Sequence, residues 1–133
     1  MNPIFADTFY FLALLNRDDA AHSKARTASE KLTDPILTTA WVLTEVADAL
    51  AAPRLRQVFL SLMEVLRSDP NTTIVPPSET FFDEGLKFYA ERPDKDWTLT
   101  DCISFVVMEQ QAITQALTGD HHFEQAGFRA LLR

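Results

Sequence analysis

The sequence has little of what defines several common classes of protein. Its 133 residues include a single cysteine, Cys102, which excludes an internal disulfide framework. The apolar neighbours of Cys102 suggest a buried thiol, and a chain that uses so little cysteine is by default cytoplasmic. No apolar run reaches the ~18 consecutive residues that a membrane-spanning helix needs, and the first residues lack the basic region of a secretory signal peptide. We therefore expect a cytoplasmic protein that makes no use of a membrane.

Basic residues are also scarce. The 12 lysines and arginines are outnumbered by 19 aspartates and glutamates, so the formal net charge is -7. This balance argues against an extended basic surface of the kind that usually contacts nucleic-acid phosphates. Most of the surplus carboxylates are expected to be solvated on the surface. A minority clustered around bound cations would reverse the sign of the local field, so the acidic residues need individual inspection.

What is present is an ordinary globular pattern. Hydrophobic residues make up 47% of the chain, glycine and proline are few, and no repeat or low-complexity segment is visible. We expect one domain over residues 1–133, long enough to bury about two-thirds of its unfolded surface.

The spacing of apolar residues predicts alternating short strands and helices. Strands are expected at 3–7, 36–39, 72–75 and 112–118, with a further edge strand at 128–133, and helices at 8–16, 19–33, 41–52, 54–68, 79–91 and 97–111, with a helical turn after Asp120. This alternation predicts an α/β fold, a three-layer α/β/α sandwich with a short central parallel sheet.

Four acidic residues occupy positions that suggest a site. Asp7 and Asp120 follow predicted strands, and chemistry in parallel sheets gathers outside the carboxyl ends of the strands. Asp101 shares a helix face with Phe105 and Met108, although that face should be buried. Glu45 lies at the margin of the apolar stripe of its own helix.

Each acid also has a structural explanation. Asp101 completes a capping box with Thr98, Asp7 and Asp120 are candidate helix N-caps, and Glu45 is a candidate half-exposed surface residue. One functional explanation covers all four, since two strand ends and two inward-facing helical carboxylates can meet in one cleft. Two like charges ~4 Å apart repel by roughly 4 kcal/mol at an effective dielectric near 20. Such a cluster either holds protons or binds a hard divalent cation, Mg²⁺ or Mn²⁺, which is the chemistry of phosphodiester hydrolysis.

Four segments, each carrying one of these acids, together resemble a known family. They are FADTFYFLALLNRDDAAH at 5–22, TTAWVLTEVADAL at 38–50, DWTLTDCISFVVM at 96–108 and LTGDHHFEQAGF at 117–128. In this order and spacing they resemble the PIN-domain family of metal-dependent nucleases, particularly the VapC-like toxins of bacterial toxin–antitoxin pairs. The resemblance covers nearly the whole chain, and its parallel sheet between helices agrees with the fold predicted above.

The resemblance implies a catalytic and metal-binding set made of Asp7, Glu45, Asp101 and Asp120, with Mg²⁺ or Mn²⁺ as cofactor. It also implies a metal-dependent endoribonuclease, the toxin of a toxin–antitoxin pair, whose partners are an RNA substrate, an antitoxin protein and a second copy of the chain. Neither the target RNA nor the number of metal ions follows from the motifs.

Several alternatives stay open at this point. The same site would serve a nuclease acting on DNA, and the fold would also serve a non-catalytic interaction module. A phospho-accepting receiver domain is disfavoured, because Ala6 precedes Asp7 and no lysine follows Lys95.

The remaining polar residues near the motifs have no settled role. Asp96 is a candidate outer-shell acid, but a solvated loop acid explains it more simply. His121 and His122 are candidate ligands or bases, but hard cations prefer oxygen. Thr8, Thr98 and Thr118 are candidates to support the carboxylates by hydrogen bonds, with capping and strand roles as the alternatives.

Overall fold

The computed structural model describes residues 2–133. Five strands form one sheet in the order β3-β2-β1-β4-β5, and every neighbouring pair is parallel. The strands are β1 (Ile4–Ala6), β2 (Ile36–Thr39), β3 (Thr72–Val75), β4 (Gln115–Leu117) and β5 (Arg129–Ala130). The predicted short parallel sheet is confirmed, with β5 as the predicted edge strand.

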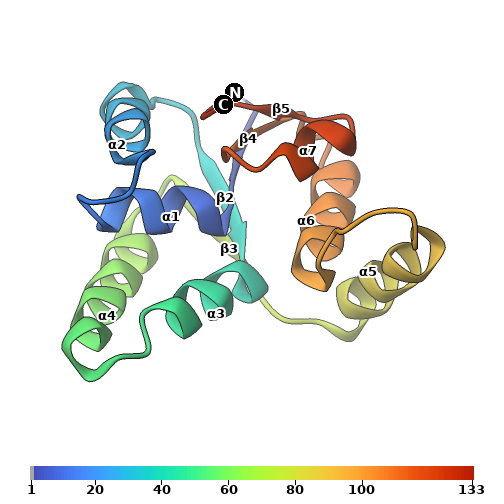
Figure 1. The fold of residues 1–133 in the computed structure, drawn as a ribbon, viewed down its shortest axis with the longest axis horizontal. Helices are drawn as coiled ribbons and strands as arrows, with labels where there is room; N and C mark the ends of the chain where they lie inside the picture. The colour runs from blue at the N-terminus through green and yellow to red at the C-terminus, as the bar shows by residue number, and fades with distance from the viewer. Residues whose placement is uncertain (1) are drawn as a thin grey trace.

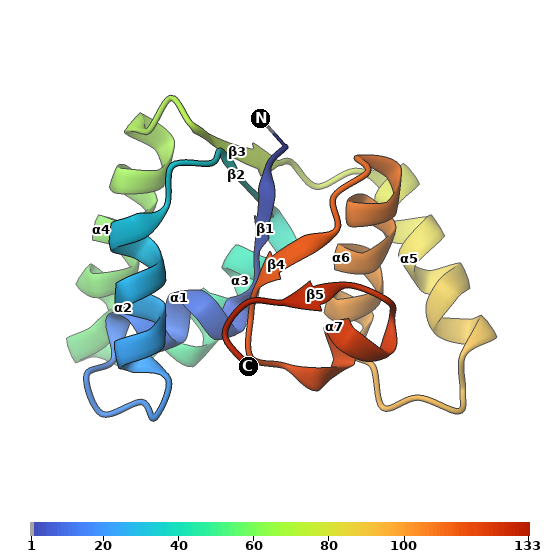
Figure 2. The same ribbon diagram turned by 90° about the horizontal axis from the view of Figure 1, so that it is seen from above.

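Helices cover both faces of this sheet. They are α1 (Thr8–Leu15), α2 (His22–Lys31), α3 (Ala40–Ala49), α4 (Pro53–Ser68), α5 (Glu79–Glu91), α6 (Leu99–Gln110) and α7 (His121–Gln125). Figures 1 and 2 show α1, α2 and α4 on one side of the strands and α5, α6 and α7 on the other. Helix α3 starts directly after β2 and contacts both α1 and α6. The three-layer sandwich is therefore confirmed. Within residues 2–133 no helix has the length and apolarity to cross a bilayer.

The core explains why α6 is apolar on almost every side. Seven of its residues are buried, and Phe105 lies at the centre of an aromatic cluster. The ring of Phe105 meets that of Phe123 edge to face with centroids 4.9 Å apart, and that of Trp97 at 5.1 Å. Such edge-to-face pairs are favourable beyond their burial. They tie α6 and α7 to the same part of the core.

Gly85 shows how closely the two outer helices approach. It lies in the middle of α5, where glycine normally destabilises a helix. A Cβ at this position would collide with the side chain of Ile103 on α6. Glycine is therefore required here by packing, and the predicted helix at 79–91 forms despite it.

Several predicted boundaries were wrong: the helix expected at 41–52 ends at Ala49, the edge strand expected at 128–133 is limited to Arg129–Ala130, and two others differ for clear local reasons. The helix expected from residue 19 starts at His22, because the side chains of Asn16 and Asp19 accept hydrogen bonds from the N–H groups two residues further on and hold the chain in turns. The strand expected at 112–118 is limited to Gln115–Leu117. The first residues of the expected strand, Ala112 and Ile113, instead form the turn that closes the end of α6.

Both α6 and α7 end in a Schellman motif. After α6, the N–H of Ile113 donates to Met108 O at 2.8 Å and the N–H of Ala112 to Glu109 O at 3.2 Å. The residue after the C-cap in this motif takes a left-handed conformation, and Ala112 has φ 55°. The corresponding residue after α7 is Gly127, with φ 95°. The same backbone geometry is thus built once with alanine and once with glycine.

These two positions provide a matched pair of substitutions. Left-handed backbone costs a residue with a Cβ about 1–2 kcal/mol, which glycine avoids. After allowing for the greater freedom of glycine in the unfolded chain, Ala112→Gly should raise the free energy of unfolding by about 0.5–1 kcal/mol. Gly127→Ala should lower it by a similar amount, since no atom lies within 4 Å of the added Cβ and only the backbone is strained. Urea denaturation measures both changes in the free energy of unfolding. Changes of the same sign in the two variants would contradict the assignment of a left-handed residue at both positions.

Candidate metal centre

Asp7 lies at the junction between β1 and α1 and is only 4% exposed. It occupies the N-cap position of α1, but its carboxylate makes no capping hydrogen bond to that helix. Oδ2 of Asp7 instead accepts a hydrogen bond of 2.9 Å from the hydroxyl of Thr118. Helix capping therefore does not account for the buried carboxylate of Asp7.

Thr118 reaches Asp7 because β1 and β4 are neighbouring parallel strands. Ala6 pairs with Leu117, so the residues that follow them leave the sheet side by side. The N–H of Asp7 donates to the carbonyl of Leu117 at 3.3 Å, which keeps the two chains together beyond the strands. The hydroxyl of Thr118 also accepts from the N–H of Asp120 at 3.0 Å. Thr118 thus holds both Asp7 and the loop that carries Asp120.

Asp120 is the N-cap of α7, as predicted. Its Oδ1 accepts a hydrogen bond of 2.9 Å from the N–H of His122. The preceding Gly119 lies against the ring of Phe9, where a Cβ would collide with that ring. This close approach fixes the path of the loop between Thr118 and Asp120.

Asp101 lies in the first turn of α6 and is 7% exposed. The predicted capping box is confirmed, because Asp101 N–H donates to Thr98 Oγ1 at 3.0 Å and Thr98 N–H donates to Asp101 Oδ2 at 3.1 Å. Oδ2 of Asp101 also lies 3.0 Å from Nδ1 of His122. Capping and closeness to the other acids are therefore not exclusive at this position.

A continuous chain of contacts joins the three aspartates. It runs from Asp7 through the Thr118 hydroxyl to Asp120, and through His122 to Asp101. These contacts use Oδ2 of Asp7, Oδ1 of Asp120 and Oδ2 of Asp101. Each aspartate thus has one oxygen engaged by this network and a second oxygen outside it.

The charges of the three acids act on one another. Burial raises the pKa of Asp7 from 3.8 to about 7, the Thr118 hydroxyl opposes this shift, and the negative charges of Asp101 and Asp120 add to it. Burial also raises the pKa of Asp101, while the N–H of Thr98 lowers it, the charge of Asp120 raises it and His122 lowers it. Like charges and desolvation both disfavour the ionised forms. A divalent cation would offset both effects.

The donor chemistry fits such a cation. Hard divalent ions take oxygen ligands, and the three aspartates present carboxylate oxygens at one end of the sheet. Among residues 2–133, the side-chain nitrogens within 4.0 Å of the Asp101 and Asp120 carboxylates belong to the histidines of α7, not to lysine or arginine. The atoms of Asp120, His121 and His122 that could ligate a metal all lie within 4.8 Å of one another. This group of potential ligands includes neither Asp7 nor Asp101, so it is the hydrogen-bond network and not this cluster that connects the three aspartates.

The structure joins three of the four predicted acids in this way and does not join Glu45. Glu45 is half-buried on α3, and none of the hydrogen bonds and charge effects described above involves it. Its link to the other acids is the packing of α3 against α1 and α6. Asp96, the candidate outer-shell acid, is exposed.

Some supporting residues were harder to find from the sequence. Thr118 and Thr98 do bond the carboxylates through their hydroxyl and backbone groups, whereas the buried hydroxyl of Thr8 has no partner among residues 2–133 and only its backbone N–H supports Asp7. His122 was discounted as a ligand, yet it contacts both Asp101 and Asp120. In the sequence, what indicates this role of His122 is its position two residues after Asp120. Cys102 is buried as predicted, and burial with the nearby Asp101 charge raises the pKa of its thiol to about 11.

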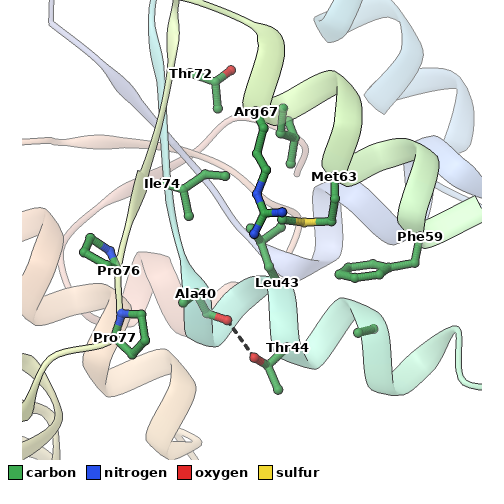
Figure 3. A pocket seen from close by; sticks show the side chains of 12 residues that line it. Ala40, Leu43, Thr44, Phe59, Met63, Arg67, Thr72, Ile74, Pro76 and Pro77 are labelled. Carbon is green, nitrogen blue, oxygen red and sulfur yellow. Dashed lines mark hydrogen bonds between the residues drawn. The ribbon is translucent and has the colours of Figure 1, made fainter.

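A separate hollow of about 620 Å³ lies between α3, α4 and β3 (Figure 3). Its walls are mostly apolar, as the side chains of Leu43, Phe59, Met63 and Ile74 show, and the charged side chain in its lining is that of Arg67. It offers no carboxylate to a cation. The predicted acids therefore define the candidate site, and this hollow does not.

Comparison with known proteins agrees with the fold. The family model described as PIN domain matches residues 4–129. No curated protein matches the chain. Among solved structures, Mycobacterium tuberculosis VapC20, a sarcin-ricin loop cleaving toxin, has a TM-score of 0.86 at 23% identity over 94% of this chain and 95% of its own. FitAcB from Neisseria gonorrhoeae has a TM-score of 0.66 at 18% identity over 96% and 94% of the two chains. At these identities the two structures show a shared fold.

The raised pKa of Asp7 predicts how metal-free protein responds to pH. The folded state keeps a proton on Asp7 up to about pH 7, whereas the unfolded chain releases it near 3.8. The free energy of unfolding should therefore fall as the pH rises from about 4 to about 7 and change little above. Asp7→Asn carries no charge, so it should match the wild type near pH 4. At pH 8 the free energy of unfolding of Asp7→Asn should exceed that of the wild type by an amount on the order of 4 kcal/mol.

Urea denaturation in EDTA at several pH values measures this difference. Asp18→Asn, at an exposed position in the loop after α1, serves as the control, and its difference from the wild type in the free energy of unfolding should not change with pH. A difference between Asp7→Asn and the wild type that stays constant from pH 4 to pH 8 would contradict the prediction.

Proposed function

The chain belongs to the PIN-domain family, and from this premise we propose that it is a metal-dependent endoribonuclease, the toxin of a toxin–antitoxin pair. The observation that carries the proposal is the network that holds Asp7, Asp101 and Asp120 together at one end of the sheet. A structural role explains the capping bonds of Asp101 and Asp120. It does not explain why Asp7 is buried beside them with a pKa raised to about 7.

Asp7, Asp101 and Asp120 are the proposed metal ligands, and Glu45 the proposed fourth acid of the catalytic set. Mg²⁺ or Mn²⁺ suits these ligands because both ions favour carboxylate oxygen. A bound divalent cation would supply Lewis-acid stabilisation of the charge that develops on the phosphate and would activate water at neutral pH. The chain's own contribution is to hold the carboxylates. Thr118 fixes Asp7, and Thr98 fixes the engaged oxygen of Asp101.

RNA is the proposed substrate. VapC20, which shares the fold, is described as a toxin that cleaves the sarcin-ricin loop. The net charge of -7 argues against a large basic surface, and a cation held by the acids would attract the phosphate locally. DNA cleavage and binding without cleavage are the two alternative outcomes that an assay must separate.

The proposed partners are an antitoxin protein and a second copy of the chain, in the cytoplasm. Large apolar side chains are exposed on two helices, namely Leu60 and Val65 on α4 and Phe82, Leu86 and Tyr89 on α5. Exposed apolar clusters are typical of protein interfaces. The aromatic run at 9–11 is not available for this purpose, because Tyr10 and Phe11 are buried in the core and Phe9 is half-buried.

Cleavage of labelled RNA tests the enzymatic proposal. Purified protein should cut RNA in Mg²⁺ or Mn²⁺, fail to cut in EDTA, and leave single-stranded DNA intact. Asp7→Asn, Asp101→Asn and Asp120→Asn should each lower the cleavage rate by at least about 100-fold, since even supporting residues of metal sites commonly cost 10–100-fold. Glu45→Gln should lower it by about tenfold or more.

Asp48→Asn is the matched control for Glu45→Gln, because Asp48 lies on the same helix and is exposed. It should cleave at the wild-type rate. RNA binding without metal-dependent cleavage would favour the interaction module, and cleavage that survives Asp7→Asn would exclude the proposed centre.

The toxin role has a test in cells. Induced synthesis of the wild-type chain in bacteria should stop growth, and the Asp7→Asn variant should not, because it lacks a proposed metal ligand. Co-synthesis of a small protein encoded beside the gene should restore growth. Equal arrest by both chains would show that the effect does not depend on the acidic centre.

A further inference from the structure

His122 contacts two of the three aspartates, Asp101 and Asp120. It is the second residue of α7, and its side chain is 18% exposed. The next residue, Phe123, is fully buried and packs edge to face on Phe105 of α6. Helix α7 is thus anchored against the helix that carries Asp101. This anchoring holds the backbone of His122 close to Asp101.

His122 makes a different contact with each aspartate. Its backbone N–H donates to Oδ1 of Asp120 at 2.9 Å, and its ring Nδ1 lies 3.0 Å from Oδ2 of Asp101. An ionised carboxylate only accepts hydrogen bonds, so this contact with an ionised Asp101 requires the tautomer of His122 that carries its proton on Nδ1. Oδ2 of Asp101 also accepts from the N–H of Thr98. Two donors therefore engage Oδ2 of Asp101 and leave Oδ1 as the oxygen outside this network.

We propose that His122 is a positioning residue, whose ring and backbone orient Asp101 and Asp120 so that their second oxygens serve one divalent cation. The inference rests on the metal centre proposed above and adds a residue that acts through the ligands. Groups that hold metal ligands by hydrogen bonds commonly contribute 10–100-fold to metal affinity. Removal of the ring should therefore weaken metal binding without removing a ligand.

The neighbouring His121 distinguishes positioning from ligation. Its side chain is 57% exposed, and its Nδ1 lies 3.7 Å from Oδ1 of Asp120, beyond hydrogen-bond distance. The two imidazole centroids are 4.5 Å apart. Ligation by His122 would have to use Nε2, because Nδ1 contacts Asp101, and His122→Asn removes Nε2 while it keeps an N–H donor near the position of Nδ1. The positioning role assigns a function to His122 alone.

Calorimetric titration with Mn²⁺ tests this role on His122→Ala, His122→Asn and His121→Ala. His122→Ala should weaken Mn²⁺ binding by about 10–100-fold. His122→Asn should keep most of the affinity, because the asparagine amide places an N–H donor near the position of Nδ1. His121→Ala should bind Mn²⁺ within about twofold of the wild type. In RNA cleavage, His122→Ala should lower kcat at a given Mn²⁺ concentration and leave the KM for RNA unchanged.

Thermal unfolding of each variant in EDTA shows whether α7 remains folded, and His122→Asn keeps the test valid if His122→Ala unfolds. Wild-type Mn²⁺ affinity in His122→Ala would overturn the inference. Equal losses in His122→Ala and His122→Asn would also overturn it, because the hydrogen bond would then be irrelevant. A loss in His121→Ala equal to that in His122→Ala would show ligation by imidazole instead. Failure of RNA cleavage in the wild type, with Mn²⁺ binding as expected, would sink the proposed function alone.

Discussion

The burial of like charges is the constraint on which this end of the sheet depends. Asp7 is almost completely buried, and its carboxylate feels the charges of Asp101 and Asp120. Without a counter-charge, such a cluster is held only because specific donors engage each acid. The Thr118 hydroxyl is central among these donors, since it contacts Asp7 and the backbone of Asp120 at once. A protein gains nothing in stability from this arrangement in the absence of a cation.

The fold supplies this arrangement through simple geometry. Parallel neighbours β1 and β4 end together, so the residues after them meet without a long loop. Helix α6 brings a third acid in its first turn, where a capping box already fixes the carboxylate. The aromatic contact between Phe105 and Phe123 then holds α7 against α6. Local rules for strands and caps and the packing of the core thus agree on one location for the acids.

Much of this was predictable from the sequence, and the rest was not for identifiable reasons. Strand and helix periods predicted the layers, and the pattern around Thr98 predicted the cap of α6. The start of β4 was predicted three residues too early. Ala112 takes a left-handed conformation, which is unusual for alanine and cannot be recognised from its residue type. His122 was missed because its role depends on distances between α6 and α7, which sequence spacing does not encode. The sequence singled out four acids, and the structure shows that Asp7 is joined to Asp120 and Asp101, while Glu45 stands apart from the network.

The most direct test of the account is to locate the cation. Anomalous diffraction from crystals soaked in Mn²⁺ should show a peak between Asp7, Asp101 and Asp120, with a carboxylate oxygen of each close to the ~2.1 Å typical of small hard divalent ions. A peak held by Asp120 and the two adjacent histidines without Asp7, or the absence of any peak near Asp7, would contradict the claim that Asp7, Asp101 and Asp120 share a metal ion.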